Sequence, residues 1–211
     1  MLFSGRDIWR NGAFAHGGFV LAPSGLDQDG LLLKLMLSGG LYRYNAQNLA
    51  GERVVGAEWV TQVLPGWRIK RGATELKVFM GPEVQSHHLW PDDSANRLRG
   101  YSYGLRVAAE LWYEPTAETM IAADISLSSI ATSNSARAAY GWRMLEDMLG
   151  GFYVGPEIQY FGSIGYRHGR LGIHVTSMKT EDIEWSAAAG WAKDSVGRSS
   201  PYVRLSILKR R

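Results

Sequence analysis

Side-chain character alternates along this chain over unusually long segments, and this alternation limits what the chain can fold into. From Tyr101 to Tyr113 the odd positions are Tyr, Tyr, Leu, Val, Ala, Leu and Tyr, whereas the even positions include Arg106 and Glu110. Successive side chains of a β-strand point to opposite faces, so a period of two predicts a strand with one apolar and one polar face. The stretches 31–41 and 119–128 show the same pattern.

The same test applied to the whole chain predicts about twelve strands. They lie near residues 2–10, 13–22, 30–45, 51–65, 73–88, 100–114, 118–131, 134–146, 151–162, 166–179, 182–193 and 200–209. Turn-forming residues separate them, and only residues 144–151 suggest a helical turn. Closed antiparallel barrels favour an even strand number, so we predict an all-β fold in which residues 1–211 form a single domain, a closed antiparallel transmembrane β-barrel of about 12 strands.

Three observations favour a membrane barrel over a soluble sandwich, which also alternates. The segments run to about 10 to 15 residues, whereas soluble strands are usually near 5 to 6 residues long. Aromatic residues bracket the apolar face, with Tyr101 and Tyr103 at one end of a strand and Tyr113 at the other. Ten tilted residues span about 25 Å, the height of the apolar band of an outer-membrane barrel. The other face mixes small residues with charges of both signs, as we expect of a filled polar lumen.

Composition narrows the class of protein. The 211 residues contain no cysteine, which excludes disulfides and thiolate metal sites. They include 23 basic and 20 acidic side chains, and this near balance of charge indicates no nucleic-acid-binding surface. The most apolar run, residues 31–37, contains Lys34 and is much shorter than the roughly 20 residues of a membrane-spanning helix. Residues 1–12 do not read as a secretory signal peptide, so we expect a protein that is not exported or a mature form with an added Met1.

Two segments nearly repeat each other, FMGPEVQ at 79–85 and YVGPEIQ at 153–159. Strand parity places Pro82 and Pro156 on the apolar face, and Glu83 and Glu157 on the lumen face, with the glutamines following two residues later. Proline has no N–H for the strand ladder, so a neighbouring carbonyl should lack its partner, and a bulge or bend is expected at both sites.

The same parity predicts a set of lumen-facing polar residues. They are Glu83, Gln85, Arg106, Glu110, Asp124, Arg137, Arg143, Glu157, Gln159, Arg170 and His174, with His16, Glu58, Glu184 and Arg204 as further members. We expect Glu83 to meet Arg106, Asp124 to meet Arg137, and Glu157 to meet Arg143 or Arg170. Most of these pairs would satisfy charges inside a narrow barrel; the alternative is a polar passage whose charges select what enters.

No enzyme signature stands out in the sequence, so we expect no catalytic residue, cofactor or bound metal. The segment HHLWPDD brings together His87, His88, Asp92 and Asp93 in a predicted loop. Adjacent histidines on a strand point to opposite faces, so a solvated loop is favoured over a metal site. His174 at a lumen position is more often a structural hydrogen-bonding residue than a ligand.

Several segments together resemble the alphaproteobacterial cellulose biosynthesis protein BcsS family. The most specific are the two GPE-containing segments and PDDSANRLRG at 91–100, and the similarity extends over nearly the whole chain. The resemblance implies an outer-membrane β-barrel of a Gram-negative bacterium, encoded with cellulose synthase components and made with a signal peptide that is absent from this sequence. It implies no catalytic residue.

The leading hypothesis is an outer-membrane accessory of cellulose biosynthesis and secretion, acting as a pore, a glucan contact or a scaffold. Its partners would be outer-membrane lipid and a glucan chain or cellulose synthase export components. One alternative is an outer-membrane hydrolase or acyltransferase acting on lipid or glycan, for which the His87 to Asp93 segment is the candidate site. Another is a soluble lipocalin-like binder, which would turn Leu105, Val107 and Leu111 inward around an apolar cavity.

Overall fold

The computed structural model describes residues 1–145 and 151–210, which form twelve strands and two short 3₁₀ helices. The strands are β1 (Leu2–Trp9), β2 (Gly12–Leu21), β3 (Gly30–Ala46), β4 (Glu52–Arg71), β5 (Thr74–Trp90), β6 (Gly100–Thr116), β7 (Thr119–Ser128), β8 (Asn134–Met144), β9 (Phe152–Ser163), β10 (Tyr166–Thr180), β11 (Ile183–Asp194) and β12 (Ser199–Lys209). The helices are η1 (Gln47–Leu49) and η2 (Ile130–Thr132). Neither described helix has the length or apolar character needed to cross a membrane.

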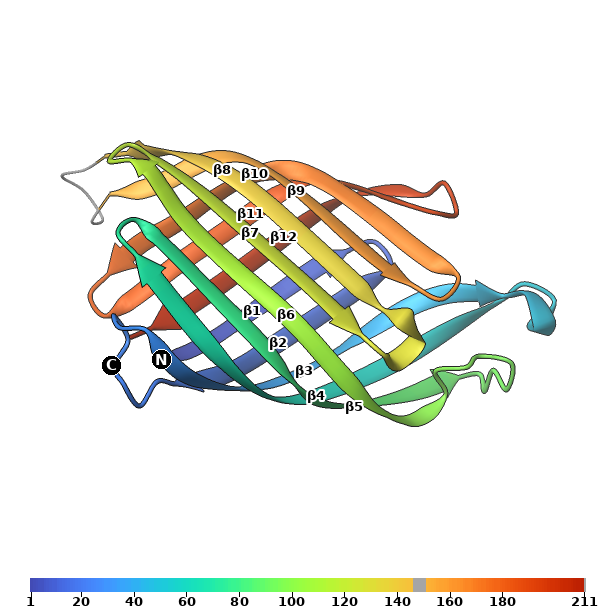
Figure 1. Ribbon diagram of the computed structural model, residues 1–211. Coiled ribbons are helices and arrows are strands. Elements are labelled where there is room, and N and C mark those ends of the chain that lie inside the picture. Colours follow the sequence, from blue (N-terminus) through green and yellow to red (C-terminus); the bar gives the residue numbers. More distant parts are fainter. Residues whose placement is uncertain (146–150, 211) are drawn as a thin grey trace.

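Each strand pairs antiparallel with its neighbours in sequence, and β1 pairs with β12 to close the barrel. Both chain termini lie at the same end of the barrel, and the β3–β4 and β5–β6 hairpins project from the opposite end (Figure 1). Closure leaves no strand edge unpaired along the wall, as a β-structure in lipid requires. The predicted closed antiparallel barrel of about twelve strands is confirmed.

The predicted segment ends agree with the structure to within about three residues, with one exception. The segment that was expected to end at Pro65 continues through Pro65 to Arg71 at the end of β4. Pro65 stays in register with Leu33 of β3, and the pairing continues beyond it to Arg68 opposite Gly30. The helical turn expected within 144–151 falls largely outside the described residues, and Met144 is the last residue of β8.

The two faces of the wall differ in the way the alternation predicts. On β6, Leu105 is 59% exposed and Val107 is 47% exposed on the outer surface, whereas Arg106 between them points inward and pairs with Glu83. The lipocalin-like alternative is therefore wrong, because it requires the apolar residues inside and the charges outside. A closed wall that is apolar outside and polar inside is suited to a bilayer.

The expected bulges at Pro82 and Pro156 are absent, and a gap in the ladder replaces them. The β4–β5 ladder is interrupted between the pairs Gln62–Glu83 and Gly66–Phe79 without a shift in register. The β8–β9 ladder is interrupted in the same way between Ala139–Glu157 and Trp142–Val154. On the other side of each proline the ladder is continuous. Each proline therefore breaks pairing with one neighbouring strand only.

The register shifts of the described residues occur elsewhere, between Tyr113 and Thr116 and between Val175 and Met178. Glycine explains why the proline sites need no extra residue. A Cβ at Gly81 would lie 2.1 Å from the Val63 carbonyl oxygen, and one at Gly155 would lie 1.9 Å from the Tyr140 carbonyl oxygen. The backbones can approach this closely only because both positions are glycine.

The projecting hairpins are held together by the loop that follows β5. Asp93 accepts hydrogen bonds from the Tyr44 hydroxyl at 2.7 Å and from the Asn48 side chain at 2.9 Å, both in the β3–β4 hairpin. It also accepts one from the Ala95 backbone N–H at 3.1 Å. The Tyr44 hydroxyl is the main reason that the pKa of Asp93 lies below its ordinary value of 3.8. The PDD segment thus fastens one hairpin to the other.

Candidate functional site: the polar lumen

Glu83 of the first GPE segment is the centre of a polar network on one side of the lumen. Its carboxylate accepts hydrogen bonds from Gln62 at 2.9 Å and from the Ser128 hydroxyl at 2.9 Å, and also from Arg106 and Gln85. The glutamate is 1% exposed. A carboxylate with this many donors is kept ionised inside the wall and joins β4, β5, β6 and β7.

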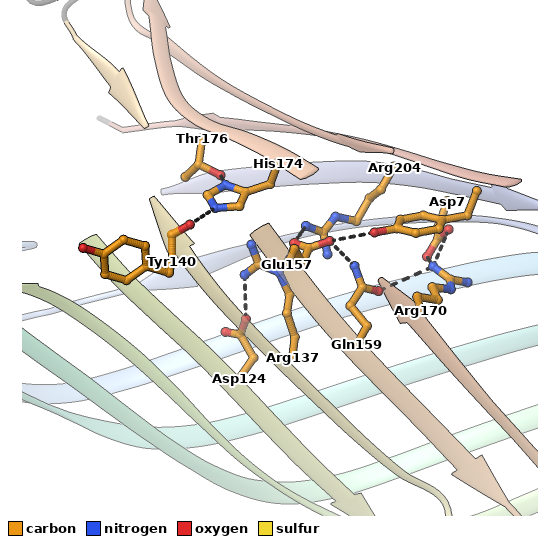
Figure 2. Close-up of polar contacts among 11 residues, drawn as sticks. Asp7, Asp124, Arg137, Tyr140, Glu157, Gln159, Arg170, His174, Thr176 and Arg204 are labelled. Atoms are coloured by element: carbon orange, nitrogen blue, oxygen red, sulfur yellow. Dashed lines mark hydrogen bonds and ion pairs between the residues drawn. The ribbon is translucent and has the colours of Figure 1, made fainter. Parts of the chain in front are cut away.

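Glu157 of the second segment has the same role on β9, four strands further along the wall (Figure 2). It accepts hydrogen bonds from Arg137 at 2.6 Å and from Tyr202 at 3.3 Å, and also from Arg204 and Gln159. Arg137 donates in addition to Asp124 at 2.9 Å. This network joins β7, β8 and β9 to β12, the strand that closes the barrel by pairing with β1.

The two copies share a local design. In each, the glutamine two residues after the glutamate projects from the same face of the strand and donates to that glutamate, Gln85 to Glu83 and Gln159 to Glu157. Each glutamate then receives at least one guanidinium from another strand. The repeated sequence therefore builds two glutamate–glutamine acceptor groups with an arginine partner.

The second copy also provides a partner for the carbonyl that proline leaves unpaired. By continuity of register Tyr140 stands opposite Pro156, and the Tyr140 carbonyl oxygen lies 3.1 Å from His174 Nε2. His174 lies opposite Gly155 on β10, and its Nδ1 is 3.0 Å from the Thr176 hydroxyl. Gly155 has no side chain to obstruct the imidazole, so the histidine extends over it to β8 (Figure 2).

Other ion pairs connect strands that are not neighbours in the wall. Lys34 of β3 lies 2.6 Å from Glu110 of β6, and Arg170 of β10 lies 2.6 Å from Asp7 of β1. The Arg170 guanidinium also lies 4.6 Å from the Trp9 ring centroid. Each of these pairs crosses part of the lumen, because three steps along the wall separate its two strands.

The network does not remove all charged groups from solvent. The side chains of Glu83 and Glu157 are 0% exposed, whereas that of Asp124 is 44% exposed although it projects into the barrel. Glu110 and Asp7 also retain accessible side-chain surface. Polar surface that no protein atom covers therefore remains beside the two buried glutamates.

The structure shows which of the ion pairs expected from strand parity form. The pairs Glu83–Arg106 and Asp124–Arg137 form. The expected partners of Glu157 are wrong, because Arg137 and Arg204 occupy its carboxylate. Arg170 instead binds Asp7, and Arg143 near the end of β8 donates to the Ala117 carbonyl at 3.2 Å.

Several contributors to the lumen were not singled out from the sequence. They are Asp7, Lys34, Gln62, Lys77, Ser126, Ser128, Thr176 and Tyr202. Parity alone would have found Lys34, since it interrupts an apolar run at an inward position. The hydroxyl residues have no such signal, because serine and tyrosine also occur outside.

The four residues of the HHLWPDD segment do not converge. His87 and His88 belong to β5 rather than to a loop. His87 is buried and its Nδ1 lies 2.9 Å from the Tyr42 hydroxyl, whereas His88 is exposed on the opposite face. Asp92 pairs with Arg99 at 2.5 Å, and Asp93 fastens the hairpins. No group of histidine and acidic side chains among residues 1–145 and 151–210 has the arrangement of a metal site.

These features define the class of the protein: a transmembrane β-barrel of the outer-membrane type with a charged interior. The family model for cellulose biosynthesis protein BcsS matches residues 1–211, and the chain belongs to this family. Family membership relates the barrel to cellulose biosynthesis. A comparison with curated protein sequences finds no significant match.

Solved structures with the same architecture are outer-membrane barrels. The KdgM porin in complex with disordered oligogalacturonate has 10% sequence identity and a TM-score of 0.51, with 100% of this chain and 98% of that chain covered. LpxR from Salmonella typhimurium has 10% identity and a TM-score of 0.53, with 98% of this chain and 99% of that chain covered. At this identity the likeness concerns the fold.

Proposed function

We propose that the protein is a narrow, water-filled passage in the outer membrane of a Gram-negative bacterium that serves the secretion of cellulose or of its fragments. The observation that carries the proposal is the solvent-exposed surface of inward-facing charges, above all the 44% exposure of Asp124. A lumen filled only to satisfy its own charges would leave such a side chain enclosed.

The chemistry of the lining favours a neutral, hydroxyl-rich solute. Acidic and basic groups are interleaved, as in the pairs Asp124–Arg137 and Lys34–Glu110, so neither cations nor anions meet a ring of one sign. Carboxylates, guanidinium groups and amides offer both acceptors and donors for sugar hydroxyls. These properties suit a glucan better than a charged polymer.

The test is single-channel conductance of the purified protein in a planar bilayer, with and without added cello-oligosaccharides. We expect discrete conductance steps that the sugar reduces at both voltage polarities. The Asp124→Trp variant should lower the conductance because it fills the lumen, whereas Ile125→Trp on the outer face should leave it unchanged. Protein that inserts but never conducts would contradict the passage and favour a scaffold.

We further propose that the protein is not an enzyme. The separation of His87, His88, Asp92 and Asp93 supports this, as does the structural role of Asp93. Alanine at His88 and at Asp92, which leaves the hairpin contacts intact, should not alter cellulose secretion by cells. A loss of secretion with normal barrel assembly would instead favour the hydrolase or acyltransferase alternative.

A further inference from the structure

A basin with a volume of about 400 Å³ lies at the end of the barrel opposite the chain termini. It is bounded by the β1–β2 turn, the β3–β4 hairpin and the β11–β12 turn. Four arginines line it: Arg10, Arg43, Arg53 and Arg198. None of the described residues that line it carries a carboxylate.

Three of the four arginines are not neutralised. Arg198 pairs with Asp194 at 2.8 Å, whereas Arg10, Arg43 and Arg53 form no ion pair within the described part of the chain and are exposed. The lining also contains the amide side chains of Asn11 and Asn45. Guanidinium and amide N–H groups together form a receptor rich in donors, which suits an anion such as phosphate.

Part of the basin's lining lies on the outer surface of the barrel, while Tyr44 lines it from the inward side. Along the β3–β4 hairpin, Tyr44, Ala46 and Val54 point inward and belong to one packed cluster. Arg43 and Arg53 alternate with these residues, so their side chains lie on the opposite, outer face of the hairpin. Arg43 and Arg53 therefore face a lipid headgroup that lies against the outer surface.

The arginines lie just beyond the apolar band. Ile8 and Leu41 are exposed apolar residues on the outer surface. Arg43 is the next outer residue of β3 after Leu41, and Arg10 follows Ile8 in the turn directly after β1. Two residues of a strand span about 7 Å, so these guanidinium groups begin where lipid chains end and headgroups start. The phosphates of a lipid lie at this depth.

A fifth arginine supports a lipid ligand. Arg6 is exposed on the outer face of β1, between the outer positions Ser4 and Ile8, and pairs in register with Leu205 and Ala15. A charge that faces lipid is unfavourable unless its long side chain extends to the headgroup region. Arg6 lies on β1, which leads into the β1–β2 turn that carries Arg10, so a phosphate at the basin would offer Arg6 an anion toward that end.

The longer hairpins of outer-membrane barrels face the cell exterior, so the basin beside the β3–β4 hairpin lies at the outer leaflet. We propose that Arg10, Arg43, Arg53 and Arg198 form a binding site for the phosphate groups of an outer-leaflet lipid, with Arg6 directed toward the same headgroup. The site would fix the rotational position of the barrel in the membrane and hold lipid against the projecting β3–β4 hairpin. The proposal rests on the outer-membrane placement proposed above, but not on conduction through the lumen.

The test is native mass spectrometry of the full chain in neutral detergent, with bisphosphorylated lipid A as the probe and its dephosphorylated form for comparison. We expect wild-type protein to retain lipid A and the Arg43→Gln/Arg53→Gln variant to retain at least tenfold less. Arg97→Gln, which removes an exposed arginine from the β5–β6 loop, is the matched control and should bind like wild type. A heat-dependent shift in gel mobility verifies that each variant is folded.

Other results would overturn the assignment. Equal retention of both lipid forms would exclude the phosphates as the bound groups. Displacement of lipid A by inorganic phosphate at equal concentration would indicate a site for free anions, and retention of an acidic oligosaccharide without lipid would indicate a saccharide site. Failure of the protein to associate with phosphatidylcholine vesicles would instead contradict the membrane placement, which separates that failure from failure of the phosphate site.

Discussion

At the scale of residues, the two glutamates show how a barrel accommodates buried charge. Glu157 accepts from Arg137 and Arg204 as well as from two neutral donors, so each of its oxygens has partners. A buried carboxylate is tolerated only when such partners are complete. Asp124 has one arginine and the remaining exposure described above, which suits contact with water.

His174 and Pro156 are expected to depend on each other. His174→Ala should lower the free energy of unfolding by about 2 kcal/mol, because the part-buried Tyr140 carbonyl loses its donor. Pro156→Ala restores a backbone N–H opposite that carbonyl, so His174→Ala should have a smaller effect in this background. Urea titrations of the four proteins in detergent give the coupling. Equal losses in both backgrounds would contradict this role for the histidine.

Asp93 gives the projecting hairpins a dependence on pH. Its folded-state pKa lies below 3.8, mainly because of the Tyr44 hydroxyl. The stabilisation is therefore complete above the ordinary pKa and is lost as the pH falls through the lower folded value. Exchange of the backbone amide hydrogens of residues 94–99, corrected for intrinsic rates, should be slow at pH 5. It should become faster once the pH falls below about 3.8. Asp93→Asn should exchange rapidly across this range; an unchanged profile would contradict the clamp.

The sequence predicts which side chains enter the lumen, but not all of their partners. Parity fixes the faces of Glu157 and Arg204, since it depends only on the strand period. The contact between them depends on closure, because β9 and β12 are three strands apart along the wall. Arg170 and Asp7 meet across the closure point for the same reason. Reasoning from adjacent strands therefore found Glu83–Arg106 and missed Glu157–Arg204.

At the scale of elements, the glycine before each proline determines whether two strands can approach. Gly155→Ala places a methyl group against the Tyr140 carbonyl and should lower the free energy of unfolding by about 3 kcal/mol or prevent barrel formation. Gly169→Ala on β10 is the matched control, because its nearest neighbour to the added Cβ would be 3.9 Å away. The shift in gel mobility on heating, recorded after refolding, measures barrel formation and stability in both variants. Similar stability of the two variants would contradict the close-approach account.

Strand ends were predictable where turn residues are frequent and less so where proline lies inside a strand. Pro65 of β4 is opposite Met80 by continuity of register, within the ladder gap that also contains Pro82. Since both prolines use the same gap, neither ends its strand. The predicted segment 51–65 is therefore shorter than β4, which continues through Pro65 to Arg71.

At the scale of the whole molecule, the account depends on a barrel with lipid outside and water inside. Exposed leucine, valine and isoleucine residues cover its outer surface, whereas ionised groups meet inside. The family assignment connects this architecture to cellulose biosynthesis. The water-filled lumen is the part of the account that an experiment has to test.

Cysteine accessibility tests the central claim most directly, because these 211 residues contain no cysteine. Asp124 and Ile125 are adjacent on β7 and face opposite sides, so Asp124→Cys and Ile125→Cys form a matched pair. In lipid vesicles, a small charged thiol reagent should modify the cysteine at position 124 and leave the one at position 125 unmodified. Modification at 125 with protection at 124, or protection at both positions in correctly inserted protein, would contradict a water-filled lumen.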